Sequence, residues 1–84
     1  MDTEQTIVPV TMRAVCQRIG RKLTANNGGE LHPVKVRKAR GERARQNVGD
    51  YFIVKGDIVI ASGIDPEAYG RELGVVRAFE TVVG

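Results

Sequence analysis

The stretch Tyr51-Phe52-Ile53-Val54-Lys55-Gly56-Asp57-Ile58-Val59-Ile60-Ala61 decides the fold. Two runs rich in β-branched and aromatic residues, a composition typical of strands, flank Gly56 and Asp57. Glycine followed by aspartate suits a two-residue turn whose first central residue has positive φ. The stretch therefore predicts a β-hairpin.

Both faces of this hairpin are apolar. With Gly56 and Asp57 as the loop, Ile53 pairs with Ile60. The side chains on the other side are then those of Phe52, Val54, Val59 and Ala61. Because neither face is polar, we expect the hairpin in the middle of the fold, with helices on one face and part of the other face covered.

An amphipathic helix precedes the hairpin. One apolar stripe of helical period contains Met12, Val15, Cys16, Ile19 and Leu23. Thr11 suits the N-cap, and the residues 26–29 (Asn-Asn-Gly-Gly) supply left-handed conformations that stop the helix. The bases of this segment lie off the stripe or at its margin, which predicts a basic outer face.

A strand and a basic loop connect the helix to the hairpin. Leu31, Val34 and Val36 predict a strand, and Pro33 places it at a sheet edge because proline has no N–H for a ladder. Residues 38–47 contain no apolar residue larger than alanine. We expect an exposed loop there, with a helical turn around residues 42–46 as the alternative.

A second helix follows the hairpin. Asp65 suits its N-cap, Pro66 its first turn, and Gly74 its end, with Glu67 and Arg71 spaced for an i, i+4 ion pair. The glycine at position 70 costs about 1 kcal/mol relative to alanine in a helix. We therefore expect this short helix to depend on packing Tyr69 and Leu73 on the sheet.

The ends of the chain are less regular. Residues 1–11 are interpreted as a flexible lead or a short edge strand at residues 7–10, and residues 75–83 as a further strand or a docking segment. Residues 12–84 then form a single α+β domain. Its predicted architecture is a small antiparallel sheet, consisting of the central hairpin and an edge strand, packed with an N-terminal helix and a short C-terminal helix.

Charge is unevenly distributed along the 84 residues, whose net charge is +3. Residues 12–49 contain ten bases and two acids, a net charge of +8, whereas residues 50–84 contain six acids and three bases. A basic surface neutralises phosphates and also binds acidic protein surfaces. The predicted binding residues, for nucleic acid or an acidic partner, are Arg13, Arg18, Arg21, Lys22, Lys35, Arg37, Lys38, Arg40, Arg43 and Arg45.

The composition argues against catalysis and metal binding. Cys16 is the only cysteine and His32 the only histidine. The chain therefore offers only one imidazole to a nucleophilic pair and too few cysteines and histidines for the usual ligand set of a structural zinc ion. Cys16 is interpreted as a small core residue, His32 as a loop or strand-end residue, and Gly28 as part of a helix stop. We predict no enzyme activity, no cofactor and no metal site. The absence of a long apolar run and of a basic, apolar leader predicts a cytoplasmic protein that does not enter membranes.

Three stretches carry a resemblance to known proteins: residues 17–23 (QRIGRKL), 48–54 (VGDYFIV) and 64–75 (IDPEAYGRELGV). With this spacing, the chain resembles a group of short uncharacterised bacterial proteins that are often associated with phages and mobile elements. The resemblance covers residues 12–76 and implies a host or phage cytoplasm. It implies no activity and no site residues.

Three hypotheses follow from these observations. The first is a small non-enzymatic accessory or regulatory protein that binds DNA or RNA through its arginine-rich surface. The second is a protein-binding modulator, for example a phage-encoded, anti-CRISPR-like inhibitor of a host defence complex, that uses the same bases. The third is a structural protein that forms a homodimer through its edge strand or its C-terminal tail.

Overall fold

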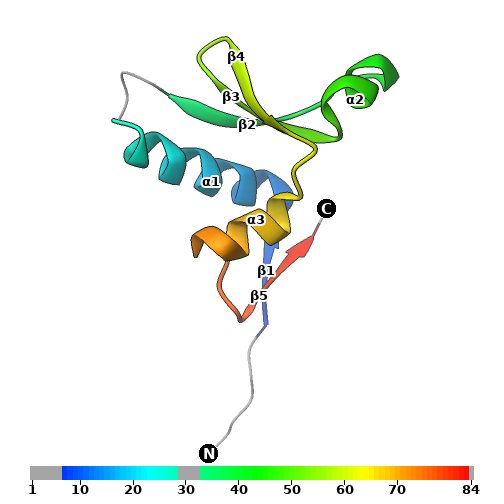
Figure 1. Ribbon diagram of the computed structural model, residues 1–84. Helices are drawn as coiled ribbons and strands as arrows, with labels where there is room; N and C mark the ends of the chain where they lie inside the picture. Colours follow the sequence, from blue (N-terminus) through cyan, green and yellow to red (C-terminus); the bar gives the residue numbers. More distant parts are fainter. Residues whose placement is uncertain (1–6, 29–32, 84) are drawn as a thin grey trace, which may run out of the picture.

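The computed structural model describes residues 7–28 and 33–83 (Figure 1). Its elements are β1 (Val8–Thr11), α1 (Met12–Asn26), β2 (Val34–Lys38), α2 (Glu42–Val48), β3 (Tyr51–Lys55), β4 (Ile58–Ser62), α3 (Pro66–Leu73) and β5 (Glu80–Val83). Strands β2, β3 and β4 form an antiparallel sheet in that order, and β1 pairs with β5 in parallel. The predicted α+β class with a small antiparallel sheet is confirmed.

Helix α1 provides the centre of the core. The Thr11 hydroxyl accepts the N–H of Ala14 at 3.1 Å, so the predicted N-cap is present. Val15 and Ile19 of the predicted stripe are fully buried. The helix ends at Asn26, and Gly28 beyond it has positive φ, while Gly29 lies outside the described residues.

The hairpin forms with the predicted turn. Gly56 has a φ of +61°, and no non-glycine residue of the described chain has positive φ, so Asp57 fits the second turn position. The predicted pairing of Ile53 with Ile60 is wrong, because Ile53 lies opposite Ala61. A β-bulge between Ile53 and Val54 in the register leaves Ile60 as the extra residue of β4.

The hairpin is not central as a whole. Strand β3 occupies the middle of the sheet, with Ile53 and Val54 buried, but β4 is an edge strand. The prediction that both strands are covered is therefore wrong for β4. Its apolar residues stay exposed because no element of the described chain packs along its outer side.

Strand β2 is the other edge of the sheet, as predicted from Pro33. It begins at Val34, and the predicted strand residue Leu31 lies outside the described residues. Helix α1 comes close to β2 at Gly20, where a Cβ would lie 3.1 Å from the carbonyl oxygen of Val34. The helical turn expected around residues 42–46 is present and is longer than predicted, because residues 42–48 form helix α2.

Helix α3 has its predicted ends, and its packing differs from the prediction. The Asp65 carboxylate accepts the N–H of Glu67 at 3.1 Å, and Arg71 pairs with Glu67 at 3.3 Å. Tyr69 and Leu73 pack against the core cluster around α1, while no substantial contact joins α3 to the three-stranded sheet. The expectation that α3 packs on the sheet is wrong because α1 and the residues after α3 bury its apolar side.

Candidate nucleic-acid interface

The ten bases predicted as binding residues lie almost entirely on the surface. Nine of the ten are exposed, and Arg18 is half-buried. Within residues 7–28 and 33–83, two ion pairs form, one between Arg18 and Glu80 and one between Arg71 and Glu67. The nine exposed bases therefore keep their charges unpaired in the described part of the chain.

Arg18 is held inside the fold. Its guanidinium donates to both carboxylate oxygens of Glu80, at 2.9 and 3.0 Å, and to the carbonyl oxygen of Val75 at 3.0 Å. Glu80 is only 8% exposed and also accepts the backbone N–H of Arg77 at 2.8 Å. These bonds to Arg18 and Arg77 lower the pKa of Glu80. Arg18 thus attaches strand β5 to helix α1.

One face of the sheet combines bases with an aromatic ring. In the register of β2 and β3, Arg37 lies opposite Phe52, and Lys35 lies opposite Val54. Directly opposite residues of an antiparallel pair share a face, so these four side chains lie on one side of the sheet. Lys35 and Arg37 are exposed and Phe52 is half-buried. We call these four residues the platform.

The platform faces away from α1. The opposite face of β2 carries Val34 and Val36, and Val36 packs against the core cluster around α1. Tyr51 shares that opposite face and lies near Cys16 of α1, and its pKa is raised by burial and then by Cys16 and Asp50. On the platform, Lys35, Arg37 and part of Phe52 are therefore accessible to a ligand, while Val54 is buried beneath them.

Further bases lie between the end of β2 and α2, and the first of them, Lys38, lies opposite Tyr51 on the other face from the platform. Helix α2 lies at the end of the sheet, beyond the last residues of β2 (Figure 1). All four bases of this region are exposed: Lys38, Arg40, Arg43 and Arg45. Glu42 is the one acid within residues 35–45, so this end of the molecule is strongly positive.

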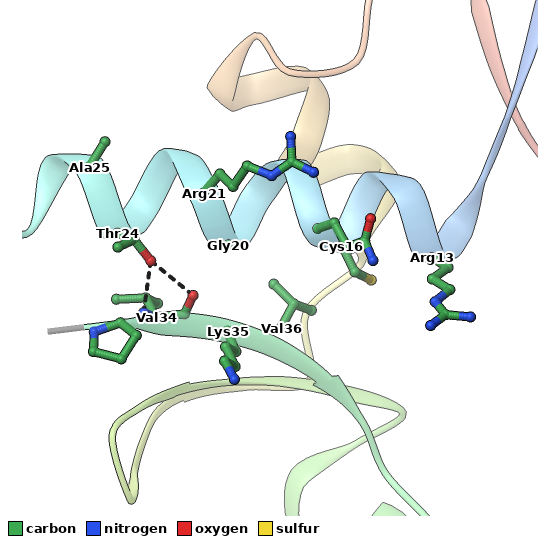
Figure 2. A pocket seen from close by; sticks show the side chains of 11 residues that line it. Arg13, Cys16, Gly20, Arg21, Thr24, Ala25, Val34, Lys35 and Val36 are labelled. Carbon is green, nitrogen blue, oxygen red and sulfur yellow. Dashed lines mark hydrogen bonds between the residues drawn. The ribbon is translucent and has the colours of Figure 1, made fainter. Parts of the chain in front are cut away.

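A groove between α1 and β2 holds a second group of bases. It has a volume of about 780 Å³, and Arg13, Arg21 and Lys35 line it together with apolar residues such as Val34 and Val36. Figure 2 shows Thr24 bonded to Val34 at one end and β2 diverging from α1 at the other. None of the described residues that line the groove is acidic. An anionic group with an apolar part fits this surface.

The remaining predicted base lies in a smaller hollow of about 640 Å³ on the other side of α1. Arg21 and Lys22 line it with Arg77, Phe79 and Glu80. The ten predicted bases are therefore spread over three surfaces: the platform with α2, the groove, and this hollow. Two of these bases border two surfaces each: Arg21 borders the groove and the hollow, and Lys35 borders the platform and the groove.

Sequence reasoning missed two residues of these surfaces. The sequence of the hairpin does not show that a base lies beside Phe52, because only the register of β2 with β3 places Arg37 opposite Phe52. Arg77 was counted in the acidic half of the chain, but the fold places it beside Arg21 and Lys22. The alternation of Lys35 and Arg37 along β2 was the available signal for the platform.

The other candidates do not gather into a chemical site. Cys16 is a free, half-buried thiol whose pKa is raised by burial. His32 lies outside the described residues. Across residues 7–28 and 33–83, no three His, Cys, Asp or Glu side chains come together as metal ligands would.

Comparisons with known proteins add no relative. No family model, curated protein or solved structure matches the chain. In the described part of the chain, every helix is too short or too polar for a membrane crossing.

Proposed function

We propose that this protein is a small non-enzymatic accessory or regulatory protein of the cytoplasm that binds nucleic acid through the platform and the bases of α2. The observation that supports this most directly is the position of the half-buried Phe52 opposite the exposed Arg37, on the sheet face that points away from α1. An aromatic ring offers a stacking surface to an unpaired base, and the bases beside it neutralise the phosphates. This combination favours single strands over duplexes.

The first test is the salt dependence of binding, measured by fluorescence anisotropy with a labelled single strand and a mixed duplex. If the four bases of the platform and α2 each contact a phosphate, log affinity for the single strand falls against log salt with a slope of about −2.8. Tighter binding to the single strand is expected. An absence of binding to either probe at low salt contradicts the proposal.

Two substitutions in the platform separate its two contributions. Arg37→Gln should weaken binding and reduce the salt slope by about 0.7, because one phosphate contact is lost. Phe52→Leu keeps the apolar bulk, loses the aromatic ring, and should weaken binding roughly 5- to 100-fold with an unchanged slope. Arg77→Gln is the matched control, because it removes the same charge from the hollow on another side. If only the control weakens binding, the site lies there and the platform is not the interface.

The groove supports a second candidate function, the binding of an acidic protein. Its apolar residues can accept an anchor side chain, while Arg13 and Arg21 face the acidic surroundings of that anchor. Such a partner would suit a phage-encoded inhibitor of a host defence complex. Pull-down from host lysate with and without nuclease treatment tests this. A protein that is captured after nuclease treatment by the wild type, and not by the double variant R13Q/R21Q, supports the second function. Captured protein that is lost on nuclease treatment contradicts it.

A further inference from the structure

Strand β4 presents an unprotected apolar edge. Ile58, Val59 and Ile60 are 67%, 46% and 53% exposed, although they form three consecutive large apolar residues. Edge strands in soluble proteins are usually blunted by charged residues, prolines, β-bulges or a covering element, because an open edge pairs with other strands. Of these devices, β4 has the bulge at Ile60. Residues 58–62 (IVIAS) contain neither charge nor proline.

The other edge of the same sheet is protected. The N–H of Val34 in β2 donates to the Thr24 hydroxyl at 2.9 Å, and that hydroxyl donates to the Val34 carbonyl oxygen at 3.2 Å. Lys35, Arg37 and Lys38 add charge to β2. The fold therefore closes one edge of the sheet and leaves the other open.

We propose that β4 pairs antiparallel with β4 of a second copy of this chain, so that two three-stranded sheets join into one sheet of six strands. The register supports a pairing centred on Val59. Lys55 and Ile58 flank the two-residue turn and exchange hydrogen bonds, so the N–H and C=O of Val59, the next residue, point away from β3. Val59 of each copy can then exchange both bonds with Val59 of the other.

A second copy fits this edge better than a charged partner. The strand has no charge to offer to an acidic or basic segment, whereas an identical strand matches its apolar residues, because Ile58 of each copy then lies opposite Ile60 of the other. A two-fold contact also requires a surface that complements itself, and an uncharged apolar row meets that requirement. The other strands of the described chain that lie at an edge are less suited to such a contact, because β2 and β5 carry charged residues and β1 contains Pro9.

The β-bulge limits the regular part of this pairing to the residues around Val59. Because Ile60 is the extra residue of β4, it is released from the regular ladder with β3. Its side chain is exposed. In the proposed dimer, Ile60 of each copy lies opposite Ile58 of the other, on the face of the joined sheet away from Val59.

The dimer has a consequence that rests on the proposed function. Pairing of Val59 with Val59 places equivalent faces of both sheets on the same side, since opposite residues share a face. Val59 lies on the platform face, opposite Val54. The two platforms would then face the same side and present two stacking sites to one nucleic-acid strand.

Sedimentation equilibrium without nucleic acid tests the dimer independently of that function. We expect wild-type protein to form a reversible dimer with a dissociation constant in the range of about 1 to 100 µM, typical of a small interface. Val59→Lys should raise this constant at least about tenfold, because a charge in the interface is left unpaired. Ile7→Lys is the matched control: Ile7 is 64% exposed and precedes β1, far from the hairpin (Figure 1). A wild-type protein that stays monomeric at several hundred micromolar, or equal weakening by both variants, overturns the proposal.

Disulfide trapping checks the register. Paired Cα atoms in a hydrogen-bonded antiparallel position lie about 5.5 Å apart, within the range that a disulfide spans. In a Cys16→Ala background, Val59→Cys should cross-link into a dimer under mild oxidation, and Ile7→Cys should stay monomeric. Circular dichroism establishes that each variant is folded. Equal cross-linking of the two variants, or none at position 59, refutes the β4 pairing even if nucleic-acid binding is observed.

Discussion

Replacement of Gly49 by alanine should destabilise the protein far more than the same change at Gly41. The two glycines bound helix α2, and their backbones are nearly the same: φ and ψ are 80° and −172° at Gly49, and 84° and 163° at Gly41. This region is essentially restricted to glycine, and another residue pays about 1–3 kcal/mol there. The surroundings of the two positions differ.

The difference comes from Gly63. A Cβ at Gly49 would lie 2.7 Å from the Cα and 3.0 Å from the N of Gly63, whereas a Cβ at Gly41 meets nothing within 4 Å. Backbone atoms cannot rotate away, and the 2.8 Å bond from the Gly63 N–H to the Val48 carbonyl lies at the same junction. Overpacking costs about 1–3 kcal/mol. The total cost is therefore about 2–6 kcal/mol for G49A and about 1–3 kcal/mol for G41A.

Urea unfolding followed by circular dichroism measures both variants. G49A should lower the free energy of unfolding by roughly 2 kcal/mol more than G41A, the size of the overpacking term. Hydrogen exchange should show lost protection of the Gly63 amide in G49A alone, because its bond to Val48 is displaced. Costs that agree within about 0.5 kcal/mol would refute the reasoning, since backbone strain would then explain both variants.

Three other predictions concern stability. Gly70→Ala should destabilise by up to about 2 kcal/mol in urea unfolding, because the added Cβ lies 2.8 Å from Val76, and the gain in helix propensity of about 1 kcal/mol offsets only part of the overpacking; a stabilised variant would contradict this. Thr24→Val should cost about 1–3 kcal/mol by removing both bonds to the β2 backbone, and Thr24→Ser should restore most of it. The pKa of Glu80 is lowered by Arg18, so the stabilisation from its charged form is present above the ordinary carboxyl pKa of about 4.3 and is lost as the pH falls through the lower folded value. The melting temperature of Glu80→Gln should therefore depend less on pH below about 4.3 than that of wild type, and parallel curves would contradict the argument.

Local patterns in the sequence were sufficient for most of the elements. The N-caps at Thr11 and Asp65 and the turn at Gly56 each depend on one or two adjacent residues, and all three are present in the structure. Helix α2 was harder because residues 38–47 have no apolar period. Its bounds are set by the backbone at Gly41 and Gly49, which the residue types alone do not reveal.

Contacts between distant residues could not be predicted in the same way. The parallel pairing of β1 with β5 joins opposite ends of the chain, and the Arg18–Glu80 ion pair depends on it. The position of β4 at an edge was missed because its apolar composition is typical of a covered strand. From the sequence, Gly70 in the middle of a helix indicates only a cost in helix propensity. In the structure, the absence of a side chain at Gly70 lets α3 lie close to Val15 and Val76.

The same limit applies to the candidate site. Alternation along β2 indicates that Lys35 and Arg37 share one side, and alternation along β3 indicates the same for Phe52 and Val54. Neither pattern states that the two pairs lie opposite each other, because register depends on the partner strand. The platform is therefore a property of the sheet, although every residue that forms it was visible in the sequence.

The bases of residues 35–45 lie together at one end of the folded molecule, so the protein is positive at that end. The way two copies can pair depends on where these positive ends lie. Glu67 and Glu80 are paired with arginines, whereas the bases of residues 35–45 have no ion pair among the described residues. Two such positive ends would repel each other if they met.

In a sheet joined through β4, the two β2 strands are the outermost, five strand spacings of about 4.8 Å or roughly 24 Å apart. Because this distance is about three times the Debye length of about 8 Å at physiological salt, repulsion between the basic ends is largely screened. Pairing through β2 would instead bring Lys35, Arg37 and Lys38 of both copies together. The charge distribution and the exposed apolar edge therefore favour the same strand.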